Sequence, residues 1–442
     1  MRHPAYTQAA GGIGAVHQRR SGGLCKKTAA GNPLTGGNVE GTQLKEQLRK
    51  KVQERLDYGH DFTDEEVEEV IDEVMMTQED MVRCPVHIRT RMKREIFNSL
   101  RRLDILQGLV EDSAVTEIMI NGKDHIFIEK DGRLGRLEKG FDSLEKLQDV
   151  IQQIVAGCNR AVNEAVPIVD ARLANGSRVN IVMNPVALNG PIVTIRRFPD
   201  KPITMEQLIH GHSISEEAAG FLKHLVQAGY NIFISGGTGS GKTTFLNVLS
   251  GFIPGDERVI TIEDSAELQL QGIENLVRLE TRNSNVEGCA PINIRELIRT
   301  SLRMRPDRII VGEVRGAEAF DMMQCLNTGH DGSMSTGHAN SAQDMLSRLE
   351  NMVLMGMDLP LAAIRQQIAS GIDVIVHLGR LRDRSRRVLE ITEVIGDEGQ
   401  QIRLNPLYQF EEEGQDAKGR ILGKLQKKAE LVQTGKLRAA GL

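Results

Sequence analysis

A glycine-rich stretch near the middle of the chain carries the clearest chemical signal. Gly236, Gly241, Lys242 and Thr243 complete the pattern G-x-x-x-x-G-K-[ST] within SGGTGSGKTT. Because glycines lack a Cβ atom, successive backbone N–H groups can turn toward a polyanion, and the lysine can then reach β- and γ-phosphates. The threonine hydroxyl is placed to bind Mg²⁺. We therefore predict ATP and Mg²⁺ as ligands. The predicted ATP-binding residues are Gly236, Gly237, Thr238, Gly239, Ser240, Gly241, Lys242, Thr243 and Thr244.

Acidic residues follow two apolar runs downstream of this loop. Glu263 follows the run at 259–262, and Glu313 follows the run at 309–311. In a parallel sheet, the carboxyl ends of neighbouring strands meet at one edge, where ligands of α/β proteins bind. A carboxylate there can hold Mg²⁺ and its waters. We predict that Thr243 and Glu313 serve the metal, through the nucleotide and water, and that Glu263 or Glu313 positions a water molecule.

The histidines add one candidate site residue, and the spacing of the cysteines argues against a zinc site and a disulfide framework. His338 lies in the polar segment GSMSTGHANS, and a histidine beside a nucleotide can sense a phosphate. His330, in the same region, is interpreted as structural. The cysteines are isolated and form no C-x-x-C pair, which argues against structural zinc and a disulfide framework. They are Cys25, Cys84, Cys158, Cys289 and Cys325.

The sequence around the glycine-rich loop predicts a parallel α/β domain. Residues 231–235 are typical of a buried strand and residues 243–249 of a helix start, which is the setting that a phosphate-binding loop requires. Beyond residue 214, strand and helix patterns alternate, as in βαβ units with helices on both faces of a sheet. The basic stretch KGRILGKLQKKAELVQTGKLR is expected to be a solvated helix or a contact for an inner-membrane partner.

Upstream, the pattern predicts helices and then a smaller domain with strands. A capping box at Thr63 and Glu66 begins one amphipathic helix, and a second amphipathic stretch covers residues 87–110. From Val115 apolar and polar residues alternate, with a helix expected over 143–156. The segment PIVTIRRFPDKPIT is interpreted as the linker that closes this domain. Pairs that suit two-residue hairpin turns are Asn121-Gly122, Asp131-Gly132 and Asn175-Gly176.

These patterns divide the chain into five parts. Residues 1–40 are expected to be a disordered basic tail, because glycines and basic residues leave little there that could pack. The other expected parts are a helical bundle at 41–102, an N-terminal α/β domain at 103–200, a linker at 201–213 and a C-terminal domain at 214–442.

Composition argues against several classes of protein. The chain has 442 residues, with 55 Lys and Arg against 60 Asp and Glu, a net charge of −5, and only 3% aromatic residues. A net acidic chain with few stacking side chains does not fit a general nucleic-acid binder. No apolar run approaches the roughly 18 residues that a membrane span needs, and no secretory signal is evident. We therefore expect a cytoplasmic protein with no transmembrane segment and no nucleic-acid partner.

Four motifs in order give the chain a specific resemblance to a known family. SGGTGSGKTT, VITIEDSAEL, SLRMRPDRIIVGEVRGAEA and GSMSTGHANS resemble the Walker A, Asp box, Walker B and His box of type II and type IV secretion ATPases. Within about Leu103 to Phe410, the chain most resembles the CpaF class of tight-adherence (Flp) pili, through VTEIMINGKDHIFIEKDGRL, DARLANGSRVNIV and IRRF. The resemblance implies an α/β fold: a RecA-like P-loop ATPase domain with a parallel sheet, preceded by a smaller α/β domain and a helical N-terminal segment.

The resemblance also implies an activity and partners. Such a protein hydrolyses ATP as a homo-oligomer, commonly a hexamer, and powers pilus assembly or secretion beside inner-membrane platform proteins. One rival interpretation is a RecA-like DNA translocase, whose ATPase DNA would stimulate. Another is a nucleotide-gated scaffold with little turnover, and a small-molecule kinase fits least. One residue departs from the family pattern, because Arg384 in LRDRSRRV stands where the family commonly has glycine.

Family roles map onto individual residues. By resemblance, Glu263 matches the Asp-box glutamate that activates water, Glu313 matches the Walker B glutamate, and His338 matches the His-box residue near the γ-phosphate. Arginines from the N-terminal domain complete the site in such hexamers. The matching arginines are Arg172, Arg178, Arg196 and Arg197.

Strand geometry predicts that these four arginines do not all reach a phosphate. A two-residue turn at 175–176 would place Arg172 and Arg178 on opposite faces of their hairpin. Adjacent residues of one strand alternate as well, which separates Arg196 from Arg197. We therefore expect only some of the four to contact the nucleotide.

Overall fold

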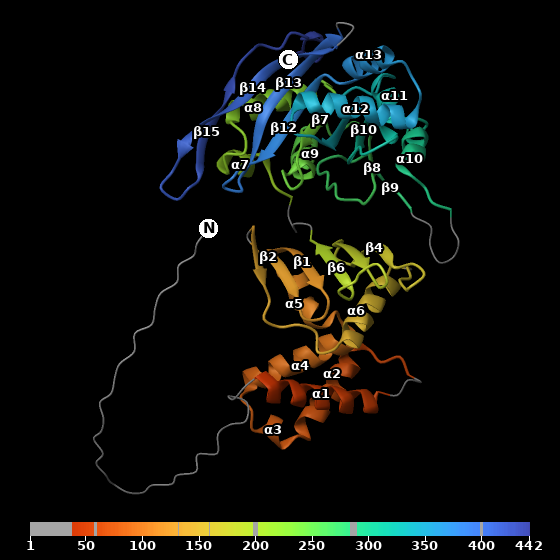
Figure 1. Cartoon of the computed structure of the whole chain (residues 1–442), viewed down its shortest axis with the longest axis vertical. Coiled ribbons are helices and arrows are strands. Elements are labelled where there is room, and N and C mark those ends of the chain that lie inside the picture. The colour runs from red at the N-terminus through yellow and green to blue at the C-terminus, as the bar shows by residue number, and fades with distance from the viewer. Residues whose placement is uncertain are drawn as a thin grey trace, which may run out of the picture. The chain divides into compact units, whose positions relative to one another are not determined.

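The described part of the chain comprises most residues from 38 onward. The structure is a computed structural model that describes residues 38–56, 60–130, 132–158, 160–197, 202–282, 290–397 and 401–442. The predicted tail lies outside these residues, except that residues 38–40 begin the first helix; Cys25, Asp131 and Cys289 also lie outside. The chain divides into two compact units, Met1–Arg102 and Leu103–Leu442, which Figure 1 colours by residue number.

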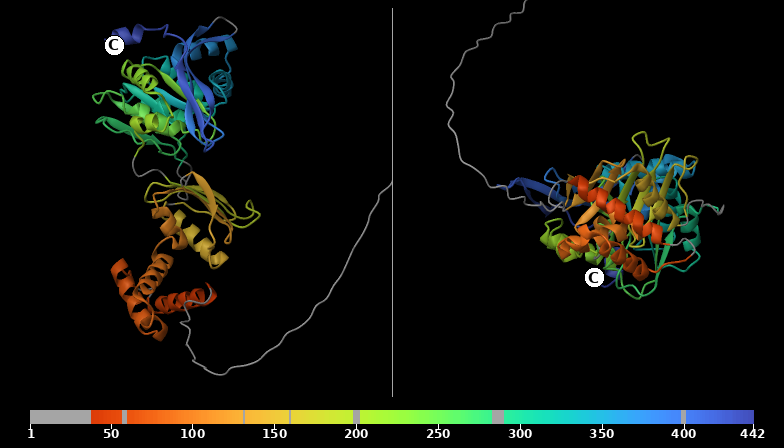
Figure 2. Two further views of the ribbon diagram at one scale, coloured as in Figure 1. Left: turned by 90° about the vertical axis from the view of Figure 1, so that its left-hand side faces the viewer. Right: turned by 90° about the horizontal axis from the view of Figure 1, so that it is seen from below.

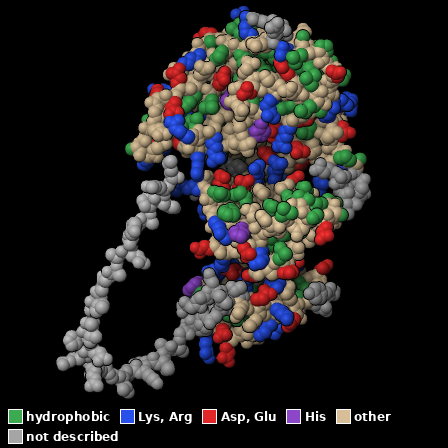
Figure 3. Space-filling view, in the orientation of Figure 1, with side chains coloured by type: hydrophobic (Ala, Val, Ile, Leu, Met, Phe, Trp, Pro, Cys, Tyr) green, Lys and Arg blue, Asp and Glu red, His purple; other side chains and the backbone are tan. Residues whose placement is uncertain are grey.

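The described residues of the first unit form helices around a small apolar core. Glu66 donates its backbone N–H to the Thr63 hydroxyl and its carboxylate accepts the Thr63 N–H, so the predicted capping box is confirmed. Val67, Ile71 and Val74 are buried, whereas Lys, Arg, Asp and Glu side chains are interspersed on the face seen in Figure 3. The helices are α1 (Asn38–Arg55), α2 (Asp64–Met76), α3 (Glu79–Val82) and α4 (Val86–Arg101).

The helical stretch predicted at 87–110 is wrong in its extent, because α4 ends earlier. The chain continues as a 3-10 helix, η1 (Asp104–Leu106), and a short helix, α5 (Gln107–Glu111). Asp104 has a φ of +52°, which a right-handed helix does not accommodate. The apolar side chains of η1 and α5 pack in a core of the second unit. The apolar spacing continues past the end of α4 because the apolar residues of η1 and α5 are also buried, but in the core of the second unit.

A six-stranded antiparallel sheet opens the second unit, in the order β3-β2-β1-β6-β5-β4. Helix α6 (Leu144–Ala156), capped by Ser143, packs with η1 and α5 on one face of this sheet. The segment interpreted as a linker contains β6, a central strand, so that interpretation is wrong for residues 192–196. The strands are β1 (Val115–Asn121), β2 (Ile126–Lys130), β3 (Arg133–Arg136), β4 (Ile168–Arg172), β5 (Arg178–Val182) and β6 (Ile192–Arg196).

The β4–β5 hairpin has a different register from the predicted one. Leu173 donates its N–H to Ser177 O at 2.9 Å, so three residues rather than two form the loop. Gly176 has a positive φ of +86° and Asn175 does not, which excludes the turn with two left-handed residues. The loop at 122–124 is likewise longer than the predicted two-residue turn, because the Asn121 N–H bonds to His125 O.

This register brings three of the candidate arginines to one face of the sheet. Arg172 lies directly opposite Arg178, and Arg178 lies directly opposite Arg196. Directly opposed residues of antiparallel strands project to the same side. The prediction that Arg172 and Arg178 face opposite ways is therefore wrong, and the extra loop residue is the reason. Arg197 alternates to the other side, as predicted.

A nine-stranded sheet forms the rest of the unit, in the order β15-β14-β13-β12-β7-β11-β10-β8-β9. The strands from β12 to β9 in this order run parallel, as predicted, whereas β13, β14 and β15 add an antiparallel extension that the sequence pattern did not reveal. The strands are β7 (Ile232–Gly236), β8 (Val259–Glu263), β9 (Leu276–Glu280), β10 (Arg308–Val311), β11 (Met334–His338), β12 (Val374–Arg380), β13 (Arg386–Asp397), β14 (Ile402–Gln415) and β15 (Ile421–Lys427).

Helices cover both faces of the large sheet, as Figures 1 and 2 show. One apolar core lies between the sheet and α7–α9, and a second lies between the sheet and α10–α13. Adjacent residues of β7 divide between the cores, with Ile232 and Ile234 in the first and Phe233 in the second. The helices are α7 (Met205–His210), α8 (Glu216–Gln227), α9 (Lys242–Ser250), α10 (Ile294–Ser301), α11 (Glu318–Leu326), α12 (Ala342–Gly356), α13 (Leu361–Gly371) and α14 (Gly435–Ala439).

The basic C-terminal stretch is not one solvated helix. Its first half is strand β15, and only its end forms the short helix α14. Lys436 pairs with Asp373 and Asp331 at 2.7 Å each, and the Tyr230 hydroxyl donates to Gln433 O at 2.6 Å. These contacts hold the C-terminal segment against the sheet. No helix in the described ranges is both long and apolar enough to cross a membrane.

The loop between β12 and β13 makes a tight turn, although it carries Arg384 where the resemblance predicts a glycine. Arg384 takes a φ of +70°, a left-handed conformation that glycine adopts without steric cost. Leu381 donates its N–H to Ser385 O at 2.8 Å, and Asp383 accepts the Ser385 N–H at 2.9 Å. The surrounding hydrogen bonds thus hold Arg384 in a strained backbone conformation.

Replacing Arg384 by glycine is therefore expected to raise the free energy of unfolding by about 0.5–1 kcal/mol, since relief of the left-handed strain exceeds the added freedom of the unfolded chain. Chemical unfolding of the full chain measures this. Arg384→Ala, which keeps the Cβ atom, is the matched control and is expected to show no gain. Equal unfolding midpoints for the glycine and alanine variants would show that the backbone at Arg384 is not strained.

Candidate nucleotide-binding site

The loop after β7 has the geometry of a phosphate cradle. β7 is buried along its whole length and ends at Gly236, where a Cβ atom would lie 2.4 Å from Leu378 O. Gly239 and Gly241 have φ values of +70° and +93°, which favour glycine. Helix α9 begins directly after the loop, so its positive end faces any anion in the cradle. The sequence prediction of strand, loop and helix is confirmed here.

Lys242 is buried at the start of α9 and turns back over the loop. Its Nζ donates to Gly237 O at 3.1 Å and lies 3.3 Å from Nδ1 of His338. Burial lowers the pKa of Lys242, and the nearby Glu313 carboxylate opposes this effect. A phosphate in the cradle would give this desolvated ammonium a charged acceptor.

The two predicted strand-end acids meet at the carboxyl edge of the sheet. Glu263 ends β8 and Glu313 follows β10, and these strands are parallel neighbours. A Cβ atom at Gly312 would lie 3.0 Å from Cγ of Glu263, so the glycine leaves room for that side chain. A side chain at position 312, where many P-loop enzymes carry aspartate, would crowd Glu263.

Glu263 is nearly fully buried and has one oxygen in use. Its Oε2 accepts backbone N–H groups of Glu267 and Leu268 at 2.6 and 2.9 Å, whereas its buried Oε1 has no hydrogen-bond partner among the described residues. Burial raises the pKa of Glu263 to about 7, although the backbone hydrogen bonds oppose the shift. An orphaned carboxylate oxygen that titrates near neutrality is suited to accept a proton from water.

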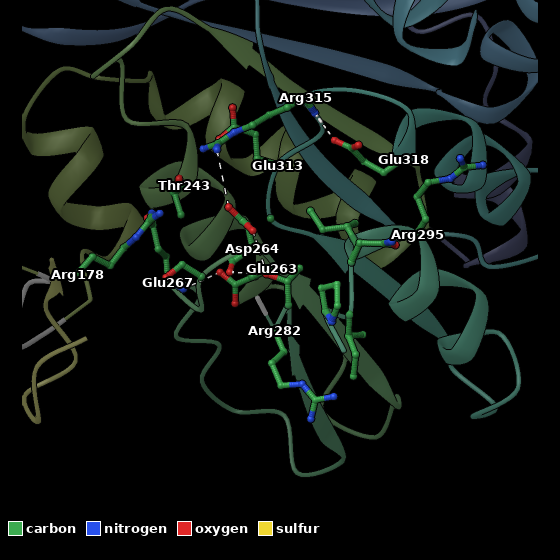
Figure 4. Close-up of a pocket in the computed structure, with 17 residues that line it drawn as sticks. Arg178, Thr243, Glu263, Asp264, Glu267, Arg282, Arg295, Glu313, Arg315 and Glu318 are labelled. Atoms are coloured by element: carbon green, nitrogen blue, oxygen red, sulfur yellow. Dashed lines mark hydrogen bonds and ion pairs between the residues drawn. The ribbon is translucent and has the colours of Figure 1, made fainter. Parts of the chain in front are cut away.

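Glu313 links a histidine and an arginine that the sequence did not single out. Nε2 of His338 lies 3.0 Å from Glu313 Oε1, and Arg315 donates to Glu313 Oε2 at 2.9 Å. Burial, followed by the charge of Lys242, lowers the pKa of His338, which favours the neutral imidazole. Arg315 also faces Asp264 at 3.9 Å, as Figure 4 shows. The sequence feature that could have singled out Arg315 is its position two residues after the strand-end acid Glu313.

A pocket of about 450 Å³ joins these groups. Thr243, Glu263 and Glu313 line it together, as the sequence predicts, and further acidic side chains and several arginines line it as well (Figure 4). Sequence patterns gave no reason to expect Arg282 and Arg295 there. The basic residues of the lining are Arg178, Arg282, Arg295 and Arg315.

Other predicted residues lie around the same loop. Gly237, Thr238 and His338 line a second pocket of about 470 Å³. Thr243 and Thr244 belong to the first turn of α9. His330 lies 3.3 Å from Cys325 O, outside both pockets, which agrees with its interpretation as structural.

The four candidate arginines have different surroundings. Arg178 lines the pocket and pairs with Glu267, and Arg172 contacts Ala266 O and Glu280. Arg196 pairs with Glu117 at 2.9 Å within its own sheet. Arg197 donates to the carbonyls of Asp112 and Val115. Arg172 and Arg178 thus contact segments at the ends of β8 and β9, whereas Arg196 and Arg197 contact β1 or the residues just before it.

The residues present fit Mg²⁺ bound with a nucleotide rather than a metal held by protein alone. Among the described residues, no three His, Cys, Asp or Glu side chains cluster as metal ligands. Mg²⁺ commonly takes only one or two protein ligands and completes its shell with phosphate oxygens and water. The Thr243 hydroxyl and the Glu313 carboxylate, beside the free Oε1 of Glu263, match that donor set.

Comparison with known proteins gives the family. The family described as "Type II/IV secretion system protein" matches residues 100–424, well over half of the chain. The chain belongs to the type II/IV secretion system protein family. This membership supports the expectation of an ATPase.

Relatives of this type II/IV secretion system protein include three curated proteins. A putative conjugal transfer protein of Mycobacterium tuberculosis is 33% identical over 69% of this chain and 88% of its own length. Conjugal transfer protein TrbB of Rhizobium radiobacter is 31% identical over 73% and 96%. Type IV secretion system protein PtlH of Bordetella pertussis is 34% identical over 65% and 93%. These names do not single out the CpaF class, so that finer resemblance stays a prediction.

Solved structures of secretion ATPases are also similar to this type II/IV secretion system protein. The VirB11 ATPase of Brucella suis is 29% identical, with 65% of this chain and 91% of that chain covered and a TM-score of 0.36. The ATPase DotB of Legionella pneumophila is 23% identical, with 66% and 80% covered and a TM-score of 0.47.

The raised pKa of Glu263 predicts a pH-dependent stability. The folded-state value of about 7 exceeds the ordinary 4.5, so the free energy of unfolding falls as pH rises from about 4.5 to 7 and stays lower above 7. Glu263→Gln removes this loss, which amounts to at most about 3 kcal/mol. We expect the variant to gain stability over the wild-type chain between pH 5 and pH 8.

Thermal unfolding of the nucleotide-free chain across this range is the measurement. The matched control is Glu274→Gln, on an exposed loop residue, which is expected to follow the wild-type curve. If Glu263→Gln also parallels the wild-type curve at every pH, Glu263 is not a proton-binding group in the folded protein.

Proposed function

We propose that this chain hydrolyses Mg·ATP to drive a secretion or pilus-assembly machine, specifically a tight-adherence (Flp) pilus of the CpaF class. One observation supports the proposal of hydrolysis: three separate parts of the chain place four functional side chains beside one glycine-rich loop. These are Lys242, Thr243, Glu263 and Glu313. Family membership and relatives named for conjugal transfer and type IV secretion support the motor role.

The chain's own residues would divide the chemistry as follows. Backbone N–H groups of 236–241 and Nζ of Lys242 hold the β- and γ-phosphates, and Thr243 and Glu313 hold Mg²⁺, which neutralises phosphate charge. Glu263 takes a proton from the attacking water through its free Oε1, because its pKa near 7 suits a base at neutral pH. Neutral His338 donates toward the γ-phosphate.

Arginines would stabilise the charge that develops on the transferred phosphoryl group. Arg178 already lines the pocket, although its guanidinium pairs with Glu267. A phosphate would compete with that carboxylate for Arg178 and, more distantly, for Arg172. Such an arginine contributes roughly 10³–10⁵ in rate in P-loop enzymes.

The motor would couple hydrolysis to movement between two domains. We propose that 103–200 and 214–442 are these domains, and that ATP and its products bind open and closed arrangements with different affinity. The predicted linker at 201–213 is not a bare connection, because its helix α7 (Met205–His210) packs into the core of the large sheet. The active form would be a homo-hexamer on the cytoplasmic side of the inner membrane, held there by platform proteins.

Lys242→Ala is expected to reduce phosphate release from Mg·ATP by at least about 100-fold, because the phosphates lose the buried ammonium of Lys242 and bind weakly. Glu313→Gln, which leaves the cradle intact, serves as the comparison and should keep nucleotide binding while hydrolysis stops. Phosphate release and binding of a fluorescent ATP analogue are measured on both. Unchanged turnover by Lys242→Ala would defeat the assignment, and absence of turnover in a wild-type chain that binds ATP would favour the scaffold interpretation.

A further inference from the structure

Two arginines of the β12–β13 hairpin face each other. Arg380 and Arg386 are directly opposed in the antiparallel register, so they project to the same side, and both are exposed. Like charges directly opposite one another destabilise a strand pair. Among the residues that the structure describes, no carboxylate pairs with either of them, whereas Arg382 of the same hairpin pairs with Glu412.

Both arginines lie against the phosphate loop. Nε of Arg386 donates to Gly239 O at 2.8 Å. A Cβ atom built on Gly241 would lie 3.5 Å from Cδ of Arg386, and one built on Gly239 would lie 3.8 Å from Nη1 of Arg380. The two glycines therefore leave space that the arginine side chains border. The unbalanced charge is concentrated beside the middle of the cradle.

The sheet order decides which end of a nucleotide this charge would meet. β7, which carries the loop, lies between β11 and β12. His338 ends β11, and Glu313 and Glu263 follow the strands beyond it, so the hydrolytic groups lie on one side of the loop. Arg380 and Arg386 come from the opposite side. A triphosphate with its γ-phosphate at Glu313 would then extend its α- and β-phosphates toward the arginine pair.

We propose that Arg380 and Arg386 form a second cationic wall of the nucleotide site and bind the α- and β-phosphates of ATP and ADP. This inference rests on the proposed nucleotide site and adds residues outside its known motifs. Guanidinium groups present several N–H donors in a plane and bind phosphate oxygens through charge-assisted hydrogen bonds. A bound polyanion would also relieve the repulsion between the two opposed arginines.

The test compares Arg380→Gln, Arg386→Gln and the double variant with the wild-type chain. Each single change is expected to raise the KM for Mg·ATP and the Kd for Mg·ADP by about 10-fold, and the double change by about 100-fold, from the strength of hydrogen bonds to charged groups. The kcat is expected to stay within about two-fold, since the γ-phosphate side is untouched. Arg382→Gln, in the same hairpin, is the matched control and should leave both constants unchanged.

Stability separates direct binding from a structural role in the loop. If the arginines bind phosphate, thermal midpoints of the nucleotide-free variants stay equal to the wild-type value or rise, because a like-charge pair has been removed. A fall in the midpoint together with a fall in kcat would mean that Arg386 only supports Gly239, and it would overturn the proposal.

Three further results would also overturn it. The first is an unchanged KM for Mg·ATP and an unchanged Kd for Mg·ADP in the double variant. The second is weaker binding of ATP with unchanged binding of ADP. The third is a changed oligomeric state with unchanged nucleotide affinity, which would assign the arginines to a subunit contact. A wild-type chain that binds neither nucleotide would instead refute the proposed function.

Discussion

The site depends on the close approach of β7 and β12 where the phosphate loop begins. Backbone atoms of Leu378 leave no room for a side chain at Gly236, and the Ser235 hydroxyl lies 2.8 Å from Nδ1 of buried His377 across the same strand pair. Burial lowers the pKa of His377 and so favours its neutral form. The two strands thereby fix the point at which the chain leaves the sheet, and with it the direction of the amide groups and of Lys242.

Charges around this fixed point pair with one another. Lys242 contacts His338, His338 contacts Glu313, and Arg315 joins that carboxylate. Arg178 is likewise engaged by Glu267. A triphosphate bound as proposed would compete for these contacts through its own oxygens, so its binding would reorganise groups from several strands at once. Such an exchange would give nucleotide binding a physical means of changing the arrangement of the pocket walls.

Local patterns in the sequence predicted the parts whose geometry is local. The capping box at Thr63, the strand–loop–helix around Lys242 and the acids at the ends of β8 and β10 depend on nearest neighbours or on one strand each. The pairing of Arg172 with Arg178 could not be predicted, because it depends on whether the loop between them has two or three residues. A single residue there reverses the face of a whole strand.

Contacts between distant segments were also out of reach of the sequence. The antiparallel strands β13–β15 bring Arg386 beside Gly239, which precedes it by well over a hundred residues. Likewise, β6 is a central strand only because β1 and β5 flank it, and its neighbouring prolines suggested a linker instead. The sequence analysis missed residues, including Arg315, whose roles depend on contacts with segments that are distant in the sequence.

Calorimetric titration of Mg·ATP into the intact wild-type chain tests whether the loop after β7 binds phosphate. We expect saturable heat that fits one nucleotide per chain, with weaker binding when Mg²⁺ is chelated. A folded chain that gives no heat of binding with Mg·ATP would contradict it, because the loop after β7 would then not be a phosphate cradle.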